Sequence, residues 1–217
     1  MSENAGAGIT FRQYENGDLE RCCEIAVRAW PEIFSMARRG EAKFAMEAYM
    51  DFYRASSSWR EVACESGAVV GLLFGRVESD LSLLGRLRAF IGEQLVYLRF
   101  LAGLYGNMSH RLLLVRKAMA DDRSKAANSP EADGEVVFFV VDRDRWGRGI
   151  GRELMDRFVR HARERGAGRI IVYTNDPGCS WGFYDRYGFR LRSTFRDNFT
   201  SYVRKEEVKA FIFSIDI

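Results

Sequence analysis

Histidine is scarce in this 217-residue chain, and its scarcity limits the chemistry that the protein can perform. The two histidines, His110 and His161, are far apart in sequence, and neither is near a second type of metal-ligating residue. Zinc sites and Ser-His-Asp catalysis both need histidine beside partners of other types. We therefore expect no metal centre and no histidine relay. His161 falls on a charged helical segment, where we expect it to be exposed.

Cysteines and long apolar runs are also few. Cys22, Cys23, Cys64 and Cys179 show neither metal-binding spacing nor a paired framework, and two adjacent cysteines cannot easily bridge each other. No apolar run approaches the ~20 residues needed to cross a bilayer. Residues 1–8 lack the charged-then-apolar layout of a signal peptide. These absences predict a reduced, cytoplasmic protein without a transmembrane segment.

A strong excess of one charge sign is absent too, since the net charge is +3 and the pI is near 8.7. A nucleic-acid partner would require a concentrated basic face, so we expect none. The charge is nevertheless uneven, because residues 143–169 hold nine arginines against four acids. That local excess suits a phosphate-bearing ligand. The length and the 47% hydrophobic content are typical of one globular domain.

The most informative stretch is a glycine-rich turn between an apolar run and a helical pattern. The run 136–141 is β-branched and aromatic, which predicts a buried strand. Apolar residues then recur at four-residue spacing, and Gly166 is placed to end a helix; they are Ile150, Leu154, Phe158 and Ala162. The first amides of a helix have no internal partner and carry partial positive charge. Gly147, Gly149 and Gly151 lack a Cβ, so a bulky anion could approach those amides.

Arginines lie among these glycines, and together they predict a pyrophosphate site; they are Arg145, Arg148 and Arg152. A P-loop would need Lys followed by Ser or Thr after the glycines, and this pair is missing. A dinucleotide fingerprint would need Gly-x-Gly-x-x-Gly and an acid about 20 residues on. Here the spacing is Gly-x-Gly-x-Gly, and the next strand, 169–174, offers no acid. On this motif alone, a plain tight turn remains the alternative.

Two motifs together resemble the GNAT-type N-acetyltransferase superfamily. Segment 146–151, Trp-Gly-Arg-Gly-Ile-Gly, matches both glycines of the acetyl-CoA loop Gln/Arg-x-x-Gly-x-Gly/Ala and departs from it at Trp146. Segment 183–189, Phe-Tyr-Asp-Arg-Tyr-Gly-Phe, fits the helix-ending signature Phe/Leu-Tyr-Glu/Asp-x-x-Gly-Phe at every defined position. The family also carries an Asn after the preceding strand, where Asn175 stands. The resemblance covers residues 135–192 well and the remainder only by element order.

The resemblance implies an α+β protein with the GNAT fold, a mixed and mostly antiparallel sheet flanked by helices in three layers. The family passes from an early hairpin to the cofactor strand through a short turn, whereas residues 79–134 intervene here. We expect a single domain, 1–217, with this segment as a helical insertion. Its apolar helical stripe is Leu84, Leu87, Ile91, Leu95, Leu98, Ala102 and Tyr105. The insertion could cover the acceptor pocket, form a homodimer face or rest on a membrane surface; we favour simple packing of the stripe on the domain.

The other elements follow from local patterns. We expect strands at 9–14, 59–65, 68–78, 190–195 and 208–217, helices at 18–30 and 41–55, an exposed loop at 121–134 and an irregular segment at 196–207. In the family, the first two helices border the acceptor site. Aromatic residues of the second helix could therefore face a substrate, although we assign most of them to the core; they include Phe44, Tyr49, Phe52 and Tyr53.

The resemblance also implies roles for single residues. Main-chain groups of the cofactor strand would bind the pantetheine arm and the acetyl carbonyl, the amides of the turn would bind the pyrophosphate, and an asparagine would bind the arm. The implied cofactor-binding residues are Phe139, Val140, Val141, Gly147, Arg148, Gly149, Ile150, Gly151, Arg152 and Asn175.

Tyr184 matches the family position that donates a proton to the departing thiolate, with packing in the core as the alternative. A phenol has a pKa near 10, close to that of an alkyl thiol, so this transfer needs little driving force. Glu135 is a candidate base that would act through water, or else a solvated strand end. Cys179 could be a nucleophile, but direct transfer needs none and no histidine is near in sequence to activate it, so we treat it as a loop residue.

We therefore expect an N-acetyltransferase that moves an acetyl group from acetyl-CoA, as co-substrate, to a primary amine of a small molecule or protein by direct transfer. The alternative is a catalytically inactive GNAT-fold module that binds acyl-CoA or a partner. Trp146 in the loop, the unassigned base and the large insertion leave room for this second interpretation.

Overall fold

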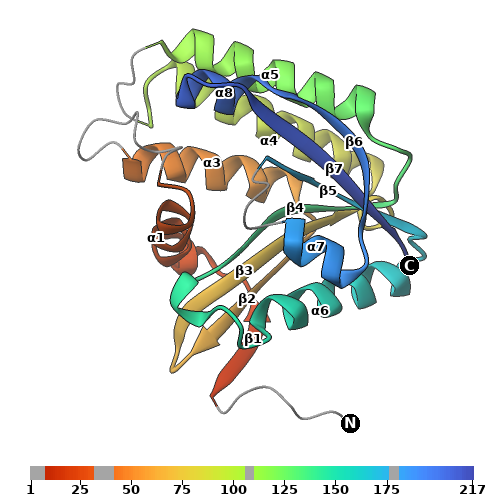
Figure 1. Ribbon diagram of the computed structural model, residues 1–217. Coiled ribbons are helices and arrows are strands. Elements are labelled where there is room, and N and C mark those ends of the chain that lie inside the picture. Colours follow the sequence, from red (N-terminus) through yellow and green to blue (C-terminus); the bar gives the residue numbers. More distant parts are fainter. Residues whose placement is uncertain (1–7, 32–41, 106–109, 176–180) are drawn as a thin grey trace.

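The computed structural model describes residues 8–31, 42–105, 110–175 and 181–217, which form a seven-stranded sheet flanked by helices (Figure 1). The strands are β1 (Ile9–Gln13), β2 (Trp59–Glu65), β3 (Ala68–Val77), β4 (Gly134–Val141), β5 (Arg169–Thr174), β6 (Arg190–Asp197) and β7 (Val208–Asp216). Their order is β1-β2-β3-β4-β5-β7-β6; β4 and β5 are parallel, and the other neighbours are antiparallel. The mixed, mostly antiparallel architecture predicted from the sequence is confirmed.

Helices cover both faces of the sheet because alternate residues of the strands are apolar on both sides. The helices are α1 (Leu19–Ala29), α3 (Ala42–Ser56), α4 (Leu83–Leu101), α5 (Arg111–Asn128), α6 (Ile150–Glu164), α7 (Trp181–Tyr187) and α8 (Asn198–Arg204). On β3, Leu72 and Phe74 pack in one cluster with α1 and α3, whereas Leu73 and Val77 pack in another with α6. Figure 1 shows α1 and α3 on one side of the sheet and α6 and α7 on the other. This arrangement gives the three layers.

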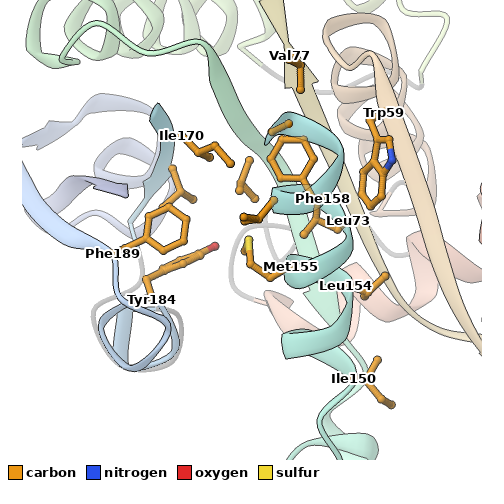
Figure 2. Packing of buried hydrophobic residues seen from close by; sticks show 14 of the residues in the cluster. Trp59, Leu73, Val77, Ile150, Leu154, Met155, Phe158, Ile170, Tyr184 and Phe189 are labelled. Carbon is orange, nitrogen blue, oxygen red and sulfur yellow. The ribbon is translucent and has the colours of Figure 1, made fainter. Parts of the chain in front are cut away.

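The sheet and α6 approach each other closely at Gly75 of β3. A Cβ at this position would lie 2.1 Å from Cε2 of Phe158, a fully buried side chain in the core shown in Figure 2. We therefore expect Gly75→Ala to lower the free energy of unfolding by about 1–3 kcal/mol, measured by urea denaturation. Gly17→Ala, whose Cβ would meet no atom within 4 Å, is the control. Equal stability of the two variants would contradict this packing.

Strands β4 and β5 diverge after a short paired stretch. Their pairing runs from Gly134 opposite Ile170 to Val136 opposite Val172, whereas β4 continues to Val141 while still paired with β3. Within the described ranges, the edge of β4 that faces β5 therefore has no strand partner after Val136. Main-chain donors and acceptors on this edge are available to a ligand.

Two helices, α4 and α5, connect β3 to β4, in the segment where a helical insertion was expected. The expectation that the apolar stripe of α4 packs on the domain is wrong, because five of its residues are exposed: Leu84, Leu87, Ile91, Leu95 and Leu98. The other face of α4 packs instead, through Val96 and Phe100 and through Gly92, where a Cβ would lie 3.1 Å from Cβ of Ala55. Both faces of this helix are apolar, so periodicity alone cannot tell which one is buried.

Two segments that were expected to be irregular are partly helical. Helix α5 continues through the first half of the expected loop 121–134, and α8 occupies the middle of segment 196–207. The carboxylate of Asp121 is buried and accepts hydrogen bonds from the main-chain amides of Asn198 (2.6 Å) and Phe199 (2.7 Å) at the start of α8. Polar residues that looked solvated thus cap a helix distant in sequence, so both predictions were wrong.

Candidate active site

The turn from β4 into α6 presents main-chain amides to an open space. Gly147 and Gly149 have φ angles of 77° and 78°, in the left-handed region that favours glycine. A Cβ on either residue would meet no atom within 4 Å. The first hydrogen bond of the helix runs from the amide of Glu153 to the carbonyl of Gly149. The amides of residues 150–152 precede this bond, have no partner within the helix and can bind an anion.

Gly151 has a different role from the other two glycines of the turn. A Cβ at this position would lie 3.0 Å from Cζ of Phe139 on β4. Glycine therefore lets the first turn of α6 approach the strand closely, while Ile150 is buried in the core. The sequence grouped the three glycines together, but only Gly151 also has this packing role against the strand.

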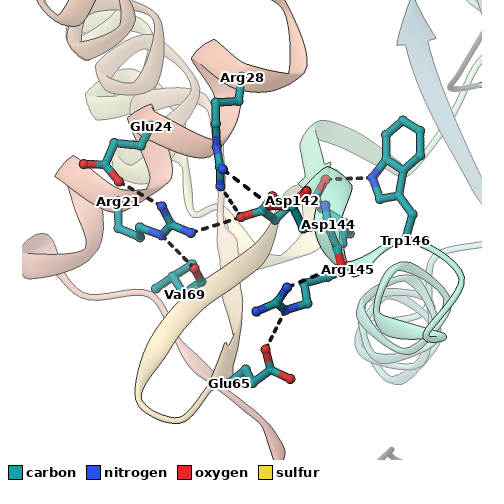
Figure 3. A network of polar contacts seen from close by, with 10 residues as sticks. Arg21, Glu24, Arg28, Glu65, Val69, Asp142, Asp144, Arg145 and Trp146 are labelled. Carbon is teal, nitrogen blue, oxygen red and sulfur yellow. Dashed lines mark hydrogen bonds and ion pairs between the residues drawn. The ribbon is translucent and has the colours of Figure 1, made fainter.

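The turn is anchored to α1 by Asp142, the residue that follows β4 (Figure 3). Its buried carboxylate accepts hydrogen bonds from Arg21 at 3.0 Å and from Arg28. The indole Nε1 of Trp146 donates to the carbonyl of Val141 at 2.9 Å. Trp146, where the sequence departs from the acetyl-CoA loop pattern, therefore helps to hold the turn against the end of the strand. None of these anchoring partners was identified from the sequence, because Arg21 and Arg28 are more than a hundred residues away.

Two of the arginines around the turn share one carboxylate. Nε of Arg145 and Nη1 of Arg148 bind Glu65, at the end of β2, at 2.5 and 2.6 Å. The guanidinium of Arg152 lies 5.8 Å from the ring centroid of Tyr187, and its Nε lies 3.8 Å from Oδ2 of Asp156. This pair is open to solvent, because the side chain of Arg152 is 70% exposed. Arg152 is therefore the arginine of this group best placed to add charge to the amides.

A cavity of about 570 Å³ lies beside this turn, large enough for a sizeable ligand. It brings together eight of the ten residues that the resemblance implied for cofactor binding: Phe139, Val140, Val141, Gly147, Gly149, Ile150, Gly151 and Arg152. Arg148 and Asn175 do not line it. Residues of α7 also line this cavity.

Tyr184 of α7 lies where this cavity meets a second one, because it lines both. Its ring is buried against Phe139, Phe189 and Phe213, with centroid distances of 6.4, 5.5 and 6.1 Å. Figure 2 shows it on the side of the core opposite Trp59. Burial raises the pKa of the phenol above its usual value, and no hydrogen bond joins its hydroxyl to another described residue. The phenol is therefore protonated at neutral pH and has a proton to donate, but its raised pKa makes it a weaker acid than the matched phenol expected from the sequence.

Asn175 follows β5 directly and lies on the wall of the second cavity. Its side-chain nitrogen donates to Oδ2 of Asp197 at 2.8 Å and to Oγ1 of Thr200 at 2.6 Å. These contacts orient the side chain through α8, so a contact with a pantetheine arm would involve its carbonyl oxygen Oδ1. Cys179 lies outside the described residues.

Glu135, at the start of β4, is a buried and ion-paired carboxylate. Its Oε2 lies 3.0 Å from Nη2 of Arg76, and its Oε1 contacts Nζ of Lys125 on α5. Burial alone would raise the pKa of Glu135, but the charges of Lys125 and Arg76 outweigh burial and lower it. A carboxylate with a lowered pKa is a weak base. Glu135 therefore joins α5 to the sheet, and it is not the solvated strand end that was considered as an alternative.

We expect Glu135→Gln to lower the free energy of unfolding by about 1–3 kcal/mol at pH 7, because it leaves two partly buried cations without their counter-charge. The folded-state pKa is lowered, so the ionised form stabilises the protein above the unfolded pKa of about 4.3, and this contribution is lost as the pH falls. The variant should thus lose less stability than the wild type between about pH 6 and pH 3. Urea denaturation at stepped pH measures both effects. Glu131→Gln, at an exposed position, is the control, and a variant as stable as the wild type at pH 7 would exclude a stabilising pair.

The second cavity, of about 290 Å³, extends from Tyr184 towards α3, α4, α5 and α8. Eleven aromatic side chains line it: Trp30, Tyr49, Phe52, Tyr53, Tyr97, Phe100, Phe138, Phe139, Tyr173, Tyr184 and Phe199. Three aromatics of α3 that we had assigned mostly to the core therefore face this space, while the side chain of Phe44 lies outside the described residues. The insertion supplies part of the wall through α4 and α5.

Carboxylates on this wall were missed from the sequence. They are Asp121, Asp122 and Asp197. A signal existed for Asp197, because an Asp before a short helical segment is a typical N-cap, and here its side chain accepts from the amide of Thr200. No local signal placed Asp121 or Asp122 at a cavity.

His161 is only partly exposed, which corrects the expectation from sequence. Its Nε2 lies 2.7 Å from Oδ2 of Asp80, and its ring stacks on Trp59 with centroids 6.2 Å apart. In the part of the chain that the structure describes, no group of three or more His, Cys, Asp or Glu side chains is arranged to hold a metal ion. Over the same residues, none of the helices has both the length and the apolar character needed to span a bilayer.

Comparison with known proteins agrees with this geometry. The profile of a family described as "Acetyltransferase (GNAT) family" matches residues 19–189. The mycothiol acetyltransferase of Geodermatophilus obscurus is 38% identical over 61 residues, a match that covers 28% of this chain and 20% of that protein. The chain thus spans only about a fifth of the length of this relative.

Solved structures share the fold at low sequence identity. SsHAT is 18% identical with a TM-score of 0.66, over 96% of this chain and 98% of that one. The structure of yncA from Salmonella typhimurium, solved with its cofactor acetyl-CoA, is 14% identical with a TM-score of 0.53, over 98% and 94% of the two chains. Similarity at this level establishes a common fold.

Proposed function

The chain belongs to the acetyltransferase (GNAT) family, and on that premise we propose that it moves an acetyl group from acetyl-CoA to a primary amine by direct transfer. The acceptor amine is carried by a small molecule or a protein. One observation carries the proposal: the glycine turn opens beside the free edge of β4, and Tyr184 lies where that cavity meets the second one. Acyl transfer needs two adjoining binding spaces and an acid at their junction.

The larger cavity is the donor site in this proposal. The amides of residues 150–152 bind the diphosphate of CoA, with Arg152 adding charge. The edge of β4 beyond Val136 binds the pantetheine arm through main-chain groups, as an added strand would. Acetyl-CoA supplies an activated thioester at the end of this arm.

The smaller cavity is the acceptor site. A neutral amine nitrogen attacks the thioester carbonyl carbon, a C–N bond forms and the C–S bond breaks. Tyr184 gives its phenolic proton to the departing sulfur, and the proton released from nitrogen returns to the phenol or passes to solvent. Main-chain N–H groups on the free edge of β4 stabilise the negative charge on the carbonyl oxygen. The products are an amide and free CoA.

We further propose that residues 1–217 form one acetyltransferase domain and that residues 79–134 are an insertion contributing to the acceptor site. Lining residues from α4 and α5 support this role. The thiols of Cys22 and Cys64 are buried and outside any disulfide, which fits the reduced, cytoplasmic setting proposed from the sequence.

The proposal is tested in two steps. Isothermal titration calorimetry with acetyl-CoA should give saturable binding, and a thiol reagent should then detect CoA release in the presence of at least one amine from a panel. Binding without release on any amine would identify an acyl-CoA-binding module instead. Absence of binding would remove both functions.

A further inference from the structure

The acceptor cavity is lined by aromatic rings and by carboxylates. This lining limits the kind of amine that the cavity can bind. The inference rests on the acetyl transfer proposed above. The ring centroids of Tyr53 and Phe138 lie 5.2 Å apart, and those of Phe52 and Tyr97 lie 5.6 Å apart. Such rings bind hydrocarbon chains and hold cations over their faces. A volume of about 290 Å³ is at the lower end for small-molecule sites, which favours a small acceptor over a protein.

The charge on the lining residues is unbalanced. Among the described residues that line the cavity, Lys125 is the one cation, and it is paired with Glu135. Asp121, Asp122 and Asp197 form no salt bridge with another described residue. Their donors are neutral groups: the hydroxyl of Tyr97 for Asp122, the amides of Asn198 and Phe199 for Asp121, and the hydroxyl of Tyr173 with the side-chain amide of Asn175 for Asp197.

Unbalanced carboxylates beside the reacting nitrogen would oppose the reaction, because they favour its protonated form, which is not a nucleophile. The same carboxylates are favourable where they meet a cation that does not react. The cavity therefore suits an acceptor with two separate nitrogen groups, one neutral at the point of transfer and one charged.

The point of transfer and the site for the charged amine lie in different parts of the cavity. Tyr184 is 4% exposed, donates to no described residue and lies against Phe139 with centroids 6.4 Å apart. Glu135 is four residues earlier on β4, about 13 Å along the strand. Lys125 on α5 contacts Glu135, and Asp122 is one helical turn before Lys125. Asp122, whose charge interacts with those of Lys125 and Glu135, thus lies near Glu135, towards the end of the cavity away from Phe139. Asp121 instead contacts the start of α8.

We propose that the acceptor is a small diamine or polyamine. One amine is acetylated beside Tyr184, the carbon chain lies along the aromatic wall, and a second, protonated amine binds Asp122 on α5.

The test compares two acceptors of equal length, 1,6-diaminohexane and 1-aminoheptane, which differ in whether a second nitrogen is present. In the CoA-release assay, kcat/KM should be at least about tenfold higher for the diamine with the wild-type protein. Asp122→Asn should bring this ratio close to one. Asp122 is chosen because its side chain is exposed at the rim and, unlike Asp121, does not cap α8. Glu164→Gln, which removes an exposed charge from residue 164 outside the cavity, should keep the ratio.

Similar kcat/KM values for the two acceptors in the wild type, or a preference that survives Asp122→Asn, would overturn the inference. If no amine releases CoA, the proposed transfer reaction is wrong. The cation site is then tested separately, by calorimetry of each amine with the protein in the presence and absence of CoA. Diamine binding about tenfold tighter than monoamine binding, lost in Asp122→Asn, would sustain the cation site. Equal binding of both amines would reject it.

Discussion

Gly149→Asp is expected to weaken acetyl-CoA binding at least about 100-fold while leaving the protein folded. The substitution places a carboxylate at the N-terminus of α6, where the proposed function puts the diphosphate of CoA. Two like charges about 5 Å apart repel by about 3 kcal/mol at an effective dielectric constant of about 20, and 100-fold in Kd corresponds to about 2.7 kcal/mol. Titration calorimetry with acetyl-CoA measures the loss of affinity.

Gly166→Asp is the matched control, because Gly166 stands beyond the other end of the same helix. Both glycines have φ of 78°, and a Cβ at either would meet no atom within 4 Å, so the backbone strain of substitution is similar, about 1–2 kcal/mol. A negative charge is favourable at a helix N-terminus and unfavourable at a C-terminus. Gly166→Asp should therefore melt at the lower temperature of the two and yet bind acetyl-CoA like the wild type. Equal affinity losses, or none for Gly149→Asp, would place the diphosphate elsewhere.

The strand-turn-helix unit around these glycines could be predicted because its signals are local. The apolar run of β4, the glycines and the four-residue spacing of α6 each report on neighbouring residues in the chain. The separate role of Gly151 could not be predicted in this way. It depends on the distance between α6 and the ring of Phe139, which is set by the packing of the sheet.

The acceptor cavity could not be predicted because its walls come from segments far apart in sequence. Asp121 and Asn198 are 77 residues apart, and only the fold shows that one caps the helix begun by the other. Without that contact, the polar segment 121–134 looked like an exposed loop. Similarly, α4 has two apolar faces, and the choice between them depends on where Ala55 of α3 lies. The sequence pattern identified the polar and apolar residues of these segments, but it did not identify the residues that they contact.

Tyr184→Phe should lower kcat by about 10²-fold or more and leave the affinity for acetyl-CoA nearly unchanged, because general acids contribute about 10²- to 10⁴-fold to such steps. The substitution keeps the ring that packs against Phe139, Phe189 and Phe213 and removes only the hydroxyl. CoA release under saturating acetyl-CoA and amine measures kcat, and calorimetry measures the affinity. Unchanged kcat would assign Tyr184 to the core alone.

Tyr187→Phe makes the same chemical change three residues later, where the hydroxyl donates to Oδ1 of Asp156 at 2.6 Å. Losing that hydrogen bond should cost about 1 kcal/mol of stability and leave kcat close to that of the wild type. Tyr184→Phe should cost no stability, because its hydroxyl has no described partner to lose. The two variants should therefore rank in opposite orders for turnover and for stability. A purely structural role for Tyr184 cannot produce that inversion, because loss of activity would then follow loss of stability.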